Sequence, residues 1–192
     1  MHGSLFGFLI VGWVEGRAGL LVNSAMSLAI LYLPAILERD YEIYMDTRLT
    51  LWITSAVFLH AVGALGVYKQ VWWYDHVTHT LSSTVVAGAG YATVRAIDEH
   101  TDSVHLPRQF IFVFILLFVL AFGVLWEVLE FGIGYASQEF GTARILTQYG
   151  VEDTMMDLLF NTLGGIIVAV WGTAYLTDLT GSIRRRLEDQ SA

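Results

Sequence analysis

An unbroken run of 17 uncharged residues, from Phe110 to Trp126, most constrains what this chain can fold into. A helix of roughly 17 to 25 residues crosses a hydrocarbon core of about 30 Å. In lipid every backbone N–H and C=O group needs an internal partner, and a helix supplies those partners within one segment. The run therefore predicts a transmembrane helix rather than a helix in the core of a soluble protein.

The rest of the sequence repeats this pattern of long apolar blocks between short polar stretches, and 55% of all residues are hydrophobic. We therefore predict an all-α fold, a polytopic transmembrane helical bundle in one integral membrane domain, residues 1–192. About five spanning helices are expected, at residues 18–37, 49–67, 77–97, 109–135 and 155–176. The stretch 5–15 is too short to span unaided. It is expected as a short interfacial or re-entrant helix, or as part of the next helix.

Basic residues predict the orientation, because cytoplasmic loops near helix ends carry the excess of lysine and arginine. If the segment 184–186 is inside, alternation through five spans places seven basic residues inside and three, Arg17, Lys69 and Arg144, outside. This bias predicts a multi-pass protein of the plasma membrane, surrounded by membrane lipid. Its polar C-terminal tail, residues 184–192, is expected in the cytoplasm.

Composition limits the partners and the chemistry of the chain. The net charge of −8 argues against a nucleic-acid partner, and the stretch Asp98, Glu99 and Asp102 predicts an acidic loop. Lys69 is the single lysine beside nine arginines, and this strongly acidic balance predicts a salt-loving source, as in halophilic archaea. The sequence has no cysteine, which excludes disulfides and thiolate metal sites.

Three clusters of ionisable residues lie at helix ends that the predicted topology places on the same, non-cytoplasmic side. Their members are mostly three or four positions apart, the spacing of neighbours on one helical face. The clusters are Asp75 with His76 and His79, Glu127 with Glu130, and Glu152 and Asp153 with Asp157 and Asn161. His60 lies in the outer half of the second predicted span. Ionisable groups in membrane segments are costly and usually face partners in the bundle, so we expect one polar site.

Imidazole and carboxylate groups are ligands for zinc, manganese and non-haem iron, so the clusters predict a site for a divalent metal ion. The predicted ligands are His76, His79, Glu130 and Asp157, with Glu127 and Asp153 as the groups that handle protons. His60, Asp75 and Asn161 are further candidates. Helical di-metal sites use a Glu-x-x-His motif. The spacing here is His-x-x-His and Glu-x-x-Glu, so the match to such sites is generic.

Structural alternatives remain open for several of these residues. Glu127 and Glu130 follow a run that is long enough to span by itself, so both could lie at the water interface. Asp153 is favoured as an N-cap or first-turn carboxylate, and His60 as a satisfied histidine of the bundle. Asp157 lies one turn deeper, where a cap does not explain it. The pair 164–165, Gly-Gly, predicts a close approach of helices.

The sequence resembles two uncharacterised groups of membrane proteins over roughly residues 49–170. It is similar to the YjdF-like inner-membrane family at Phe58-Leu59-His60, Tyr74-Asp75-His76 with His79, Glu127 with Glu130, and Asp153-Thr154 with Asp157. It also resembles the VanZ-like pattern at Asp75, His79, Glu130, Asp157, Asn161 and Gly164. It departs from that pattern at His76, where a basic residue is usual. VanZ-like proteins are associated with reduced susceptibility to a glycopeptide antibiotic, but the resemblance transfers no such role.

Three classes of function fit these patterns. The leading prediction is a metal-dependent membrane enzyme, a hydrolase or transferase that acts on a lipid or lipid-linked head group at the non-cytoplasmic face. The alternatives are an ion or proton transporter, in which the same side chains form the mouth of a path, and a non-catalytic membrane partner or assembly factor. The sequence carries no nucleophilic serine elbow, phosphate loop or nucleotide fingerprint.

Overall fold

The computed structural model describes residues 1–101, 105–140 and 150–191, and this part of the chain is all-α. In chain order the helices are α1 (His2–Val14), α2 (Ala18–Tyr41), α3 (Thr47–Val62), the π-helical turn η1 (Gly63–Val67), α4 (Tyr68–Gln70), α5 (Tyr74–His100), α6 (Arg108–Glu139), α7 (Val151–Tyr175) and α8 (Thr177–Ser191). The predicted helical bundle is confirmed. Asp102 and Arg144, used in the charge arguments above, lie outside the described residues.

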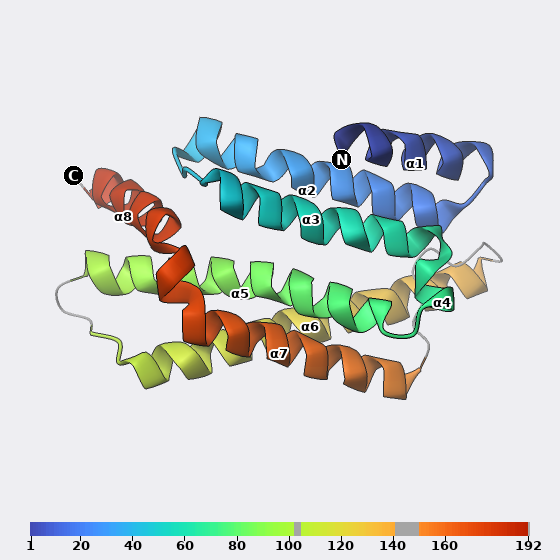
Figure 1. Ribbon diagram of the computed structural model, residues 1–192. Coiled ribbons are helices and arrows are strands. Elements are labelled where there is room, and N and C mark those ends of the chain that lie inside the picture. Colours follow the sequence, from blue (N-terminus) through green and yellow to red (C-terminus); the bar gives the residue numbers. More distant parts are fainter. Residues whose placement is uncertain (102–104, 141–149, 192) are drawn as a thin grey trace.

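Among the described residues, four helices are long and apolar enough to cross a membrane. They are α2, the continuous segment Thr47–Gln70 that contains α3, α6, and α7 up to Gly172. The expected fifth span, residues 77–97, falls within α5, which has 27 residues but does not reach the same apolar composition. Figure 1 shows α5 lying lengthwise among the other helices, and it packs against α3, α6, α7 and α8. A helix that faces protein on several sides can carry hydroxyl and small residues there instead of lipid-facing leucines.

The contact between α5 and α7 is the most extensive between any two helices in the described part of the chain. Gly164 of α7 lies directly against the first half of α5, where a Cβ atom would overlap the Ser83 hydroxyl and approach the Thr80 carbonyl to 2.5 Å. Gly165 faces α6 at Val119. The predicted close approach of helices at this glycine pair is therefore confirmed, and it fixes the start of α7 beside the start of α5.

The N-terminal apolar stretch forms a helix of its own. α1 has 13 residues, and the turn at Gly16, whose φ is +65°, reverses the chain so that α1 lies lengthwise against α2 (Figure 1). Leu5 is fully buried with Leu28, Leu31 and Ala61. The helix is therefore separate from α2, and its buried face is covered by α2 and α3.

The predicted polar tail is part of a helix. Residues 184–191 belong to α8, whose preceding residues Leu179 and Ile183 pack into the main apolar core. Arg184 pairs with Glu188 at 3.5 Å on the outer side of the helix. α8 thereby covers the end of α5 that lies far from the site described next (Figure 1).

Candidate functional site

The predicted clusters lie at one end of the bundle, where α3 ends and where α5 and α7 begin (Figure 1). Asp75 is in the first turn of α5, and Asp157 is in the second turn of α7. Glu127 and Glu130 belong to the last part of α6, which reaches the same end of the bundle. Helix boundaries alone therefore place side chains from three separate stretches of sequence in one region.

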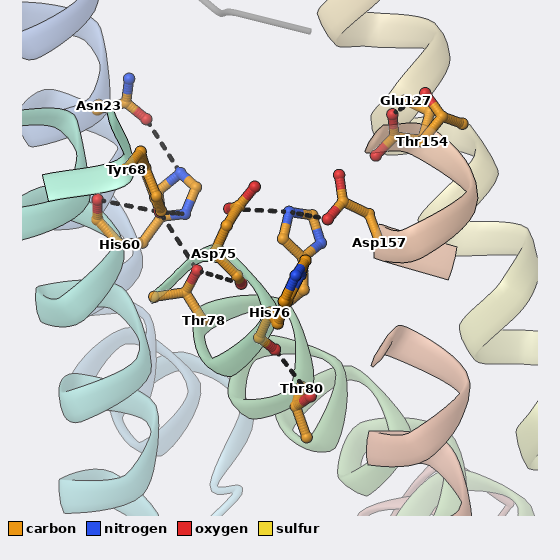
Figure 2. A network of polar contacts seen from close by, with 11 residues as sticks. Asn23, His60, Tyr68, Asp75, His76, Thr78, Thr80, Glu127, Thr154 and Asp157 are labelled. Carbon is orange, nitrogen blue, oxygen red and sulfur yellow. Dashed lines mark hydrogen bonds and ion pairs between the residues drawn. The ribbon is translucent and has the colours of Figure 1, made fainter. Parts of the chain in front are cut away.

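Asp75, His79 and Asp157 form the centre of this site. The Nε2 atom of His79 lies 3.6 Å from Asp75 Oδ1 and 3.6 Å from Asp157 Oδ1. One potential ligand atom from each residue lies within 4.8 Å of the other two. The side chain of Asp157 is only 3% exposed, and within the described parts of the chain its Oδ1 has no hydrogen-bond partner. Figure 2 shows Asp75 and Asp157 facing each other from α5 and α7.

Local geometry explains why these three side chains meet. Asp75 and His79 are four positions apart on α5, so they lie on one helical face, one turn from each other. Asp157 comes from α7, which is held against α5 by the close contact at Gly164 two turns further along. The site therefore depends on the α5–α7 contact rather than on a loop.

Further carboxylates surround this centre. Glu127 is buried, and its Oε2 accepts a hydrogen bond of 2.9 Å from the Thr154 hydroxyl, which joins α6 to α7 (Figure 2). Glu127 is therefore enclosed by the bundle, and its depth in the membrane stays a prediction. Glu130, one turn further along α6, is half-buried. We call Asp75, Glu127, Glu130, Asp153 and Asp157 the acidic cluster.

Asp153 occupies the first turn of α7, but the residue before the helix that serves as N-cap is Gly150. The expected role of Asp153 as a first-turn carboxylate therefore fits the structure, whereas the role of N-cap falls to Gly150. A carboxylate in the first turn is stabilised by the positive end of the helix dipole. Asp153 also interacts electrostatically with Asp75 and Asp157, so it belongs to the surroundings of the site.

Outside the three-residue centre, His76 and Asn161 make contacts with neighbouring helices. The ring of His76 stacks on Phe160 of α7, with ring centroids 4.3 Å apart and an interplanar angle of 8°, and meets Trp72 edge-on. Asn161 is 7% exposed and lies one turn deeper than Asp157, where its amide packs against Gly123 of α6. The structure therefore gives His76 and Asn161 contacts between helices and does not bring them into the group formed by Asp75, His79 and Asp157.

His60 has partners at both ring nitrogens. Its Nε2 lies 3.1 Å from Asn23 Oδ1, and its Nδ1 lies 2.8 Å from the Tyr68 hydroxyl. The expectation of a hydrogen-bonded histidine in the bundle fits these contacts. Sequence reasoning missed Asn23 and Tyr68. The signal that could have found Tyr68 is the pair Gly63 and Gly66 just before it, which predicts a break in an otherwise apolar helix.

At the centre of the site, the contacts with His79 do not neutralise the carboxylates of Asp75 and Asp157. A ring nitrogen donates one hydrogen, yet His79 Nε2 is shared by two carboxylates at 3.6 Å, beyond ordinary hydrogen-bond length. Ligand atoms at about 2.0 to 2.2 Å from one metal ion lie roughly 3 to 3.5 Å apart. The two distances of 3.6 Å are longer than this spacing, and what the three side chains share with sites for Mn²⁺, Fe²⁺ or Zn²⁺ is the type of their ligand atoms, two carboxylates and one imidazole.

Comparisons with known proteins place the chain among membrane proteins. A Thermotoga maritima protein named only as uncharacterized is 32% identical over 133 residues, which cover 68% of this chain and 65% of that protein. The chain thus matches about two thirds of that relative's length. No solved structure matches. The resemblance to VanZ-like and YjdF-like proteins remains a prediction.

The family match covers the helices that build the site. The family described as "Predicted membrane protein (DUF2238)" matches residues 1–178, a range that contains α1 to α7 and the whole acidic cluster. This match supports the coarser expectation of an uncharacterised membrane family. The chain belongs to the DUF2238 family of predicted membrane proteins.

Proposed function

We propose that this protein is a metal-dependent membrane enzyme, a hydrolase or transferase that acts on a lipid or lipid-linked head group. The observation that carries the proposal is the group formed by Asp75, His79 and Asp157, whose ligand atoms lie within 4.8 Å of one another. Asp157 is the decisive member, because a buried carboxylate oxygen without a hydrogen bond is costly unless a cation or proton neutralises it.

The position of the site supports a lipid head group as the substrate. Asp75 and Asp157 lie within two turns of the helix ends, and Trp72 and Trp73 are 80% and 48% exposed at the same end of the bundle. Exposed tryptophans are typical of the level of the head groups. By the distribution of arginines, this end faces away from the cytoplasm, and the proposed site faces the outer leaflet of the plasma membrane.

In the proposed reaction, the three central residues would hold the metal ion and the surrounding carboxylates would transfer protons. A divalent ion held by Asp75, His79 and Asp157 would polarise a phosphoryl or carbonyl oxygen and favour a deprotonated water. Glu127 and Asp153 are the carboxylates assigned to proton transfer, and Thr154 orients Glu127 through its hydroxyl. Glu130, half-buried beside them, is the candidate for an additional ligand.

The arrangement favours this function over a transport path. The polar contacts run across the bundle at one end, from Asn23 of α2 to Asp157 of α7, rather than along it (Figure 2). Deeper on α5, the hydroxyls of Ser83 and Thr84 donate to carbonyls of their own helix. A continuous path for ions would need polar groups that face the interior along the full length of the bundle.

The test measures metal in the protein and in matched variants. The protein is purified in detergent without metal-affinity steps, and bound transition metals are measured by mass spectrometry. We expect near-stoichiometric metal in the wild type and its loss in Asp157→Asn and His79→Gln. Glu152→Gln is the control, because Glu152 is an exposed carboxylate on the same helix as Asp157. Trace metal in the wild type, or equal metal in all variants, would contradict the proposal.

The enzymatic part has its own measurement. Metal-loaded protein is incubated with vesicles of mixed phospholipids, and released or transferred head groups are followed by mass spectrometry of the lipids. We expect head-group products that disappear with chelator and with Glu127→Gln. A protein that binds metal and leaves every lipid unchanged would favour a non-catalytic membrane partner.

A further inference from the structure

We infer that Asn23, His60 and Tyr68 form an activating triad in which the Tyr68 hydroxyl is the reactive group. The inference rests on the proposed function, because the triad would take the proton from the water or hydroxyl that attacks the head group, while Glu127 and Asp153 would supply the proton of the leaving group. Its geometry has the form that activates a weak acid: a hydroxyl, a base within hydrogen-bond reach and a third group that orients the base. Tyr68 Oη lies 2.8 Å from His60 Nδ1, and His60 Nε2 lies 3.1 Å from Asn23 Oδ1. Figure 2 shows the three side chains in this order.

The hydrogen bonds of Asn23 set the tautomer of His60. The Asn23 amide nitrogen donates to the Gly19 carbonyl at 2.8 Å, so the amide oxygen is the atom that faces the imidazole. An amide oxygen only accepts, and His60 Nε2 must therefore carry the hydrogen. In the neutral ring Nδ1 is then an acceptor, and it takes the hydrogen of the Tyr68 hydroxyl. The oxygen of Tyr68 is left with its lone pairs available to another donor.

The backbone before Tyr68 is built to bring its ring to His60. The chain passes through the π-helical turn Gly63–Val67, in which Gly66 has a φ of +128°. A Cβ atom on Gly63 would overlap the Tyr68 ring, so only glycine lets the ring lie against this turn. Single turns of π-helix are frequent at functional sites. Two glycines in a membrane segment therefore place one hydroxyl beside one imidazole nitrogen.

The triad is connected to the proposed metal site. The Thr78 hydroxyl, in the first turns of α5, lies 3.4 Å from Tyr68 Oη and donates to the Asp75 carbonyl at 2.8 Å. Trp126, which precedes Glu127 on α6, meets the His60 ring edge-on, with centroids 6.0 Å apart. The reactive oxygen therefore borders the acidic cluster.

The proton transfer balances within these groups. The O–H bond of the attacking water or hydroxyl breaks, and its proton forms a new O–H bond at Tyr68. The former Tyr68 proton moves to His60 Nδ1, and His60 becomes an imidazolium whose Nε2–H still donates to Asn23. The imidazolium then returns its proton by the same route to solvent water, and the leaving group takes its proton from Glu127 or Asp153. Tyr68 is the catalytic residue, and His60 and Asn23 are positioning residues.

The test labels tyrosines with benzenesulfonyl fluoride and compares Tyr68 with Tyr74. The phenol oxygen forms a bond to sulfur, the S–F bond breaks, fluoride leaves, and the phenol proton passes to the adjacent base. Tyr74 is a matched control, because it is also half-buried but its hydroxyl donates to the Leu59 carbonyl. A positioned base contributes at least about 100-fold, so we expect Tyr68 to react about 100-fold faster than Tyr74. Labelling is followed by peptide mass spectrometry in protein kept free of metal with chelator.

Variants separate activation from structure. We expect His60→Gln and Asn23→Leu to slow the labelling of Tyr68 to the rate of Tyr74, and Asn23→Asp, which keeps an acceptor oxygen, to restore most of it. An unchanged rate at Tyr74 reports that the fold is intact. Tyr68 labelling no faster than that of Tyr74, or insensitive to His60→Gln, would overturn the inference. Because these rates need no metal, such a failure leaves the metal-binding result of the proposed function standing.

Discussion

The two ends of α5 both carry carboxylates, but the structure treats them in opposite ways. At the end near His100, Asp98 is 6% exposed and is fully paired. Its Oδ2 accepts from Arg95 at 2.6 Å, and its Oδ1 accepts from the Leu106 backbone N–H at 2.6 Å. At the other end, Asp75 and Asp157 share one nitrogen of His79 at 3.6 Å.

This difference separates a structural carboxylate from a candidate binding carboxylate. Arg95 also binds Glu99 at 2.8 Å, so one guanidinium joins two carboxylates in the last turns of α5. A guanidinium keeps its charge at any physiological pH and holds carboxylates with directed hydrogen bonds. A shared imidazole balances less charge, because it carries a positive charge only when it is protonated. A buried carboxylate is therefore no evidence of a functional site by itself. The two ends of α5 are distinguished by the partner of the carboxylate, which is a guanidinium at one end and an imidazole at the other.

The first prediction, with the largest expected effect, removes the Arg95 guanidinium, which pairs with Asp98 and Glu99 at the end of α5 near His100. Arg95→Met should lower the free energy of unfolding by about 3 kcal/mol, because removing one partner of a buried ion pair leaves the other charge uncompensated. This value is the lower end of the usual range, since the Arg95 side chain is 31% exposed. Denaturant unfolding in detergent measures the change. If Arg95→Met were as stable as the wild type, the contrast between the two ends of α5 would fail.

The second prediction adds a cation at the other end. If the metal site exists, Mn²⁺ at about 100 times its dissociation constant should raise the free energy of unfolding by about 2.7 kcal/mol. Asp157→Asn and His79→Gln should lose this gain, and Arg95→Met should keep it, because its site residues are intact. Thermal unfolding with Mn²⁺ and with chelator makes the comparison. Equal stabilisation of Asp157→Asn by Mn²⁺ would place the binding elsewhere.

Sequence patterns predicted most of the fold, because long apolar runs leave little choice but membrane-length helices. The expected spans 18–37, 49–67 and 109–135 all lie within helical segments of the structure. The expected span 77–97 forms part of α5, but α5 is less apolar than the four helices that could cross a membrane. Its apolar pattern is diluted by hydroxyl and small residues that face α7, and the importance of those contacts appears only when α7 is in place.

The candidate site was predictable only in part. The four-residue spacing of Asp75 and His79 predicted that both side chains lie on one face of a helix. The predicted topology placed Asp157 at the same end of the bundle. The ring of His76 turns to Phe160 instead, because stacking on an aromatic side chain of α7 is a contact that no spacing within α5 reveals. The pair Gly63 and Gly66 signals a break in the helix before Tyr68, but the sequence does not show that Asn23 and Tyr68 meet at His60, because this depends on the geometry of the turn at Gly63–Val67.

The third prediction, with the smallest expected effect at the site, makes the same substitution at both ends of α5. In metal-free protein, Asp157→Asn removes a buried, poorly compensated charge and should raise the free energy of unfolding by about 1 kcal/mol. Asp98→Asn removes charge-assisted hydrogen bonds and should lower it by about 1.5 to 3 kcal/mol. Urea unfolding of both variants with chelator present measures the two signs. Opposite signs show that Asp157 is held at a cost to stability, as a binding carboxylate is. A loss of stability in both variants would mean that His79 already satisfies Asp157, which would make this end of α5 structural as well.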